Sequence, residues 1–319
     1  MQKHLILKTF KNIFKLLKIT FVQFINDRGL KLSASLSYYT VFSLAPLLLL
    51  LISLAGFFFG KEAIQGRIFG EINGLIGNQA ALQIQEIIKN MELSGKTNTA
   101  LVIGFITLII GATSVFGEIQ DSINMIWKVK VKPKRGWVKI LKDRLLSSSL
   151  IIGLGFLLIV TFMVNGVLLS LNDWMKSYFP NITLVLFQVI NVVISFAVIT
   201  LLFGVIFKVL PDVKIAWKDV RVGAFFTACL FMLGRFLIGI YIEKSETGLA
   251  YGAAGSLIII LVWVYYTAAI LYIGAEFTRA YVDFKGSKIE PATYAVFIEE
   301  HEKERNLEFI PPRKETKIM

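Results

Sequence analysis

The chain is poor in the residues that build metal and redox centres. Its 319 residues include one cysteine, Cys229, and two histidines, His4 and His301. A single cysteine excludes a disulfide framework within the chain and a cysteine-ligated metal site. Two histidines near opposite ends of the sequence do not form the paired ligands of a hydrolytic metal centre. We therefore expect neither a metal site nor another cofactor.

Sequence patterns of common enzyme classes are missing as well. The chain has no Walker-type glycine loop, no nucleophile elbow and no zinc-ligand pair. An ATP-driven pump and a hydrolase are therefore both unsupported. We expect a protein that is not an enzyme and has no catalytic residues.

Charged residues are scarce, at 18% of the chain against 55% hydrophobic residues. This balance is atypical of a soluble domain and indicates a polytopic membrane protein. Six apolar segments are each long enough to cross a bilayer as a helix. They span about 34–59, 99–117, 146–171, 183–207, 221–241 and 250–275. The predicted fold is all-α, a six-helix transmembrane bundle within a domain of residues 29–284.

Acidic residues are outnumbered, with 22 Asp and Glu against 34 Lys and Arg. Four alternate segments hold 27 of the 34 basic residues: 1–33, 118–145, 208–221 and 276–319. Basic loops stay on the cytoplasmic side, so both termini are expected to be cytoplasmic in a multi-pass protein of the cell inner membrane. The excess charge then faces anionic membrane lipids, and we expect no nucleic-acid partner.

Residues 1–28 have the pattern of a basic amphipathic helix. Apolar positions recur at helical spacing, and Lys8, Lys11, Lys15 and Lys18 recur on another side. Such a helix lies in the membrane interface, with its ammonium groups near lipid phosphates. A competing interpretation is that it packs on the cytoplasmic ends of the other helices.

Residues 61–93, after the first span, carry two apolar stripes at helical spacing, separated by Gly74 and Gly77. The pattern predicts two short amphipathic helices outside the membrane. They could cap the bundle like a lid or lie at the interface, and the sequence does not separate these options.

The first span is unusually polar in its first half. Ser37, Tyr38, Tyr39 and Ser43 are candidate substrate-binding residues, because a helix facing lipid would avoid hydroxyl groups. Pro46 predicts a kink between this half and the apolar run that follows. The alternative is that small serines simply let another backbone approach.

Three polar residues, Glu118, Asp121 and Asn124, follow the second span at spacings of three. They fall on one helical face, which either lines a path into the bundle or is a solvated helix end. Glu276, after the sixth span, either pairs with Arg279 three residues later or shares an acidic site with Glu118.

Arg235 lies inside the fifth span. A guanidinium in hydrocarbon needs a partner, water or a path to the interface. The side chain either reaches out to the interface or binds an anionic group within the bundle. We count Arg235 as a candidate substrate-binding residue together with Glu276.

Residues 285–319 form a polar tail with balanced charges and two adjacent prolines, Pro311 and Pro312. Apolar residues gather only around 294–298. We expect a cytoplasmic tail consisting of a short helix followed by disorder.

Several local motifs occur in a characteristic order along residues 20–285. They comprise Leu36, Tyr38, Ser43 and Pro46; Ile123–Asn124–Met125–Ile126–Trp127; Pro211–Asp212 with Gly223–Ala224; and Tyr251–Gly252–Ala253–Ala254–Gly255 leading to Gly274–Ala275–Glu276. Taken jointly, these motifs resemble the YihY/BrkB family of membrane proteins, some of which have carried the name ribonuclease BN. The resemblance implies a six-span inner-membrane protein active in transport or lipid handling, and it supplies no catalytic residues. The ribonuclease label does not fit a chain with two histidines.

Two functions from different classes remain. The first is a transporter or lipid translocase of the cell envelope that handles an anionic substrate. The second is a structural or scaffolding membrane protein without a conduit. The polar first span, the basic N-terminus and Arg235 favour the first.

Overall fold

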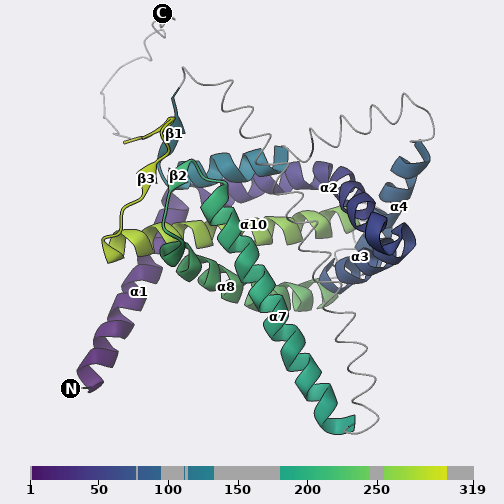
Figure 1. The fold of residues 1–319 in the computed structure, drawn as a ribbon, viewed down its shortest axis with the longest axis horizontal. Coiled ribbons are helices and arrows are strands. Elements are labelled where there is room, and N and C mark those ends of the chain that lie inside the picture. The colour runs from purple at the N-terminus through teal and green to yellow at the C-terminus, as the bar shows by residue number, and fades with distance from the viewer. Residues whose placement is uncertain are drawn as a thin grey trace, which may run out of the picture.

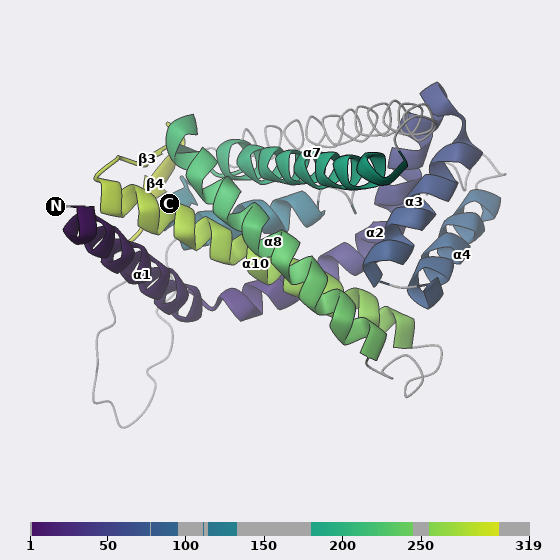
Figure 2. The same cartoon turned by 90° about the horizontal axis from the view of Figure 1, so that it is seen from below.

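The structure is a computed structural model that describes residues 2–76, 78–94, 111, 114–132, 180–244 and 255–299. These residues are mostly helical (Figure 1). The elements are α1 (Gln2–Asn26), α2 (Gly29–Phe59), α3 (Lys61–Ile76), α4 (Asn78–Ser94), a helix over 114–126, β1 (Val129–Val131), α7 (Pro180–Val209), β2 (Val213–Lys214), α8 (Trp217–Lys244), α10 (Gly255–Lys285), β3 (Glu290–Pro291) and β4 (Ala295–Phe297). Helices α3 and α4 lie at one end of the molecule, and α1 and the strands lie at the other (Figures 1 and 2).

Three of the described helices are long and apolar enough to cross a membrane. Their apolar windows are Val192–Val209 in α7, Trp217–Ile238 in α8 and Leu257–Lys285 in α10. Helix α2 covers the predicted first span and continues through Pro46, where the kink stays a prediction. The expected span 146–171, and 99–117 apart from residues 111 and 114–117, lie outside the described residues. The helical fold is confirmed, and the number of six spans stays a prediction.

Helices α8 and α10 cross at two contacts, and in each contact a glycine of one helix lies against a threonine of the other. A methyl group on Gly223 would lie 1.8 Å from the hydroxyl of Thr278, and one on Gly274 would lie 2.0 Å from that of Thr227. Each threonine hydroxyl donates a 2.7 Å hydrogen bond to the glycine carbonyl one turn earlier in its own helix. Small residues that admit a neighbouring helix are typical of contacts between membrane helices.

Helix α1 packs on α10 along one stripe and leaves another apolar stripe uncovered. Leu16 packs with Phe277 and Ala280 of α10. Phe14 is 72% exposed and Ile25 is 70% exposed. One stripe of this helix thus packs on the bundle, and contact of the exposed stripe with lipid stays a prediction.

Helices α3 and α4 cover the ends of α2 and α10. Ile68 of α3 and Ile84 of α4 are buried in one cluster with Ile52 of α2 and Ile260 of α10. The two short helices predicted for residues 61–93 are confirmed. Their apolar stripes face protein, so the pair forms a cap on the bundle.

Two small antiparallel sheets lie at the opposite end. Strand β1 pairs with β4, placing Val131 opposite Ala295, and β2 pairs with β3, placing Lys214 opposite Glu290. The short helix expected near residues 294–298 is therefore wrong. The segment is extended because its backbone groups pair with those of β1, and Ala295 is buried in that contact. Residues 300–319 lie outside the described part of the chain.

Candidate functional site

A buried carboxylate, Asp212, ties together three segments at the strand end: the 114–126 helix, the link between α7 and β2, and the link between β3 and β4. Its side chain accepts hydrogen bonds from Asn124 Nδ2 at 2.8 Å, Tyr294 Oη at 2.7 Å and Gln120 Nε2 at 3.3 Å. Its backbone N–H donates to Asn124 Oδ1 at 2.8 Å. An acid surrounded by donors is a structural junction, because its lone pairs are already used.

This junction corrects one prediction. Asn124 was expected either to line a path into the bundle or to lie at a solvated helix end, and the structure places it instead in the buried network with Asp212. Asp121 is exposed and Glu118 is partly buried, so the three residues do not share one environment. Among residues that the structure describes, no group of three or more metal-ligating side chains gathers.

A second junction forms around Asp27 in the turn between α1 and α2. Lys128 Nζ lies 2.6 Å from Asp27 Oδ1, and Arg279 Nη1 lies 3.9 Å from Asp27 Oδ2. Arg279 also donates to the carbonyl of Ile126, and Trp127 Nε1 donates to the carbonyl of Ala275 at 3.1 Å. The α1–α2 turn, the end of the 114–126 helix and α10 therefore meet at one point.

Glu276 lies beside this junction without joining it. The side chain is fully buried, and neither carboxylate oxygen has a hydrogen-bond partner among the described residues. The expected pair with Arg279 is wrong, because Arg279 bonds to Asp27, to Asp283 at 4.0 Å and to a backbone carbonyl. Two residues three apart on a helix are close enough to pair, but each can instead face a different neighbouring segment.

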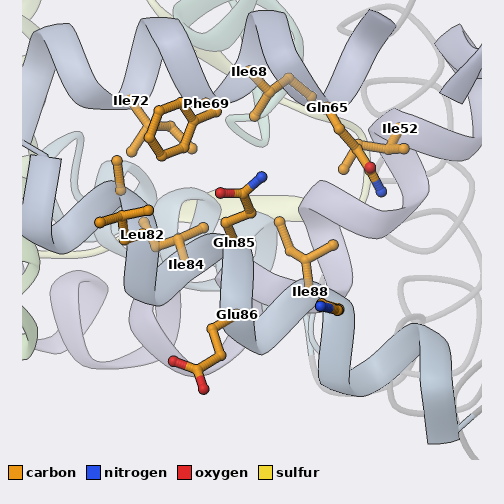
Figure 3. A pocket seen from close by; sticks show the side chains of 12 residues that line it. Ile52, Gln65, Ile68, Phe69, Ile72, Leu82, Ile84, Gln85, Glu86 and Ile88 are labelled. Atoms are coloured by element: carbon orange, nitrogen blue, oxygen red, sulfur yellow. The ribbon is translucent and has the colours of Figure 1, made fainter. Parts of the chain in front are cut away.

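A hollow opens under the cap, between α2, α3 and α4 (Figure 3). Its volume is about 660 Å³, within the range of small-molecule sites. The amide of Gln85 points into it, whereas the carboxylate of Glu86 points away. The labelled aliphatic side chains of its wall are Ile52, Ile68, Ile72, Leu82, Ile84 and Ile88. Lys89 also lines it.

The hydroxyl groups of the first span separate into two sets. Ser37 and Ser43 are buried, and a methyl group on Gly111 would lie 3.3 Å from Ser43 Oγ. Ser43 therefore serves a close approach of two helices. Tyr38 and Tyr39 are exposed, with ring centroids 5.8 Å apart. The four side chains do not converge on one cavity.

Arg235 is exposed on α8 and is not enclosed by the described helices. It makes no ion pair with any residue in the described ranges. The neighbouring residue Gly234, and not Arg235, faces α10, where it lies against the side chain of Tyr266. The hypothesis of anion binding by Arg235 therefore places the anion on the surface of α8 and stays a prediction.

Sequence reasoning missed Asp27, Asp212, Tyr294 and the cap hollow. Pro211–Asp212 was named only among the motifs shared with the YihY/BrkB family, and Asp27 stood in a short polar link between helices. A buried role for either acid depends on partners about 80 to 100 residues away along the chain. No local pattern reports such a partner.

The helical fold and its apolar spans define the class: this is a helical membrane protein. A family profile described as Virulence factor BrkB matches residues 20–294, and the chain belongs to this family. The resemblance to YihY/BrkB proteins is thereby confirmed. No solved structure matches the chain.

The relatives carry the name UPF0761 membrane protein. The protein of Psychrobacter sp. strain PRwf-1 is 27% identical over 87% of this chain and 50% of its own length. That of Azotobacter vinelandii is 29% identical over 80% and 60%, and that of Pseudoalteromonas atlantica is 24% identical over 81% and 83%. The chain thus spans about half the length of the first of these relatives and about three fifths of the second.

Proposed function

We propose that this protein binds lipids with anionic headgroups through the hollow under its cap and moves them across the cell inner membrane. In this proposal both termini are cytoplasmic and the cap of α3 and α4 is outside. The observation that carries it is the aliphatic hollow between α2, α3 and α4. Six of its twelve lining residues are isoleucine or leucine, and this apolar part of the wall suits a hydrocarbon chain.

Charge around the hollow supports an amphipathic occupant. Lys89 can meet a phosphate, and Gln65 and Gln85 supply amide groups beside the apolar wall. The carboxylate of Glu86 points away from the hollow, so it does not oppose an anionic headgroup there (Figure 3). A lipid whose acyl chain packs among the isoleucines and whose headgroup lies near Lys89 would make an apolar contact at one end and a charged contact at the other.

A scaffold without a conduit is the second candidate. It is favoured by the tight packing of α8 on α10 and by the use of Ser43 in a helix contact. A scaffold would need no aliphatic hollow, and this difference makes the two candidates separable by experiment.

Photolabelling with a lipid that carries a diazirine on its acyl chain tests the binding step. Leu82 on α4 lines the hollow and is 49% exposed, so Leu82→Trp should fill the hollow with little strain. Ile87 on the same helix is 47% exposed and does not line it, so Ile87→Trp is the matched control. We expect label on α3 and α4 in the parent and in Ile87→Trp, and a several-fold loss in Leu82→Trp. Equal labelling of both variants would contradict the proposal.

A further inference from the structure

Glu276 is a buried acid that the packing of the protein does not use. It lies on α10 where this helix contacts α1 and the 114–126 helix. Both of its carboxylate oxygens lack hydrogen-bond partners among the described residues. Buried carboxylates are normally bonded on both oxygens, and one left bare while ionised is strongly unfavourable. The side chain therefore needs a ligand that the described residues do not supply.

The charged groups that face Glu276 come from three elements. Asp27 belongs to the α1–α2 turn, Lys128 to the end of the 114–126 helix, and Arg279 to α10 itself. Lys128 and Arg279 are both engaged by Asp27. Neither cation donates a hydrogen bond to Glu276, so the acid is not the third member of an ion-pair network.

Two more buried polar atoms near the same helix contact lack hydrogen-bond partners among the described residues. The hydroxyl of Tyr272, one turn before Glu276 on α10, has no hydrogen-bond partner of ordinary geometry in the described ranges. Ser122 and Glu118 are its polar neighbours. Gln23 Oε1, one turn before Asp27 on α1, is also buried without a partner there.

A metal ion fits this set poorly. Calcium takes six to eight oxygen ligands and magnesium six, more than the four carboxylate oxygens of Glu276 and Asp27, and Asp27 is already paired with Lys128 and Arg279. These two fixed positive charges would also repel an added cation. A proton needs only one oxygen to hold it and one acceptor to bond, and two neighbouring carboxyl groups supply both.

We propose that Glu276 is a proton-binding site, in which the protonated carboxyl group donates a hydrogen bond to the carboxylate of Asp27. The proton is the ligand, and it joins α10 to the α1–α2 turn. Its loss would place two ionised carboxylates side by side and weaken this contact. The site lies at the strand end, away from the cap, so it goes beyond lipid binding and does not depend on it.

Infrared difference spectroscopy of the full-length protein in liposomes at neutral pH tests the proposal directly. The parent should show the carbonyl band of a protonated carboxylic acid, shifted in heavy water, and Glu276→Gln should lack it. Glu290→Gln in β3, which removes an exposed carboxylate, should keep the band. If Glu276→Gln instead loses an ionised carboxylate band, the proposal is wrong. A Glu276 carboxylate band that moves when sodium replaces choline would also overturn it, in favour of a metal ion.

Thermal unfolding of the same proteins provides a second test. Glutamine can donate to Asp27 as a protonated glutamate does, so Glu276→Gln should unfold within about 2 °C of the parent. Glu276→Ala removes the donor and leaves a cavity, so it should unfold at a clearly lower temperature. An equal loss in both variants would show that no donated hydrogen is needed and would overturn the proposal. A failure of lipid labelling would leave both of these results unaffected.

Discussion

At the residue scale, three acids at the strand end have different tasks because their neighbours differ. Asp212 is surrounded by donors, Asp27 is paired with cations, and Glu276 lies beside a second acid with neither of its oxygens bonded among the described residues. The first two hold segments of the chain together. Only the third is left with bonding capacity, which is why it is the acid we assign a ligand.

Replacement of Asp212 measures how much its junction contributes. Asp212→Ala removes the carboxylate that accepts hydrogen bonds from Asn124, Gln120 and Tyr294. We therefore expect a loss of about 3 kcal/mol in the free energy of unfolding. Denaturant unfolding in detergent checks this. Glu290→Ala, an exposed acid nearby in β3, is the control and should change stability by less than about 0.5 kcal/mol. Equal stability of both variants would show that the network is not structural.

Lys89 should set the headgroup preference of the cap hollow. A lysine near an anionic lipid surface contributes about 1 kcal/mol, so Lys89→Gln should lower the preference for anionic over zwitterionic lipid about fivefold. Competitive photolabelling with the two lipids measures the ratio. An unchanged ratio would remove Lys89 from the site.

At the element scale, the crossing of α8 and α10 leaves no room for a larger residue. Gly223→Ala and Gly274→Ala should each destabilise the protein by about 1–3 kcal/mol, because the added methyl group would overlap a threonine of the other helix. Gly117→Ala is the matched control. No atom of the described residues lies within 4 Å of the added methyl group there, and alanine is the better helix former, so stability should stay equal or rise. Melting temperatures in detergent decide between these outcomes.

The elements also show what sequence patterns can and cannot predict. The break between α3 and α4 follows from Gly74 and Gly77 and from the change in apolar stripe, which are local signals. Strand β4 was missed because its partner β1 is over 160 residues earlier. A strand of three residues is also too short for its apolar and polar alternation to be distinguished from helical periodicity. The hollow was missed because it exists only after α2, α3 and α4 pack together. Periodicity reports which face is buried, but not what shape the buried faces enclose.

At the scale of the whole molecule, the cap and the strand end should lie on opposite sides of the membrane. Glu86 in α4 and Lys214 in β2 are both exposed and lie at opposite ends of the protein. In a Cys229→Ser background, Glu86→Cys should react with an impermeant thiol reagent in intact cells, and Lys214→Cys should react only after the cells are opened. Labelling of Lys214→Cys in intact cells would reverse the orientation inferred from the basic residues.

The most direct test of lipid transfer follows a headgroup-labelled anionic lipid in proteoliposomes, with uptake of a small solute measured in parallel. We expect the parent and Ile87→Trp to move the lipid between leaflets without admitting the solute, and Leu82→Trp to lose most of the lipid movement. Lipid movement equal to that of empty liposomes, with all three proteins folded, would contradict this expectation and favour a scaffold.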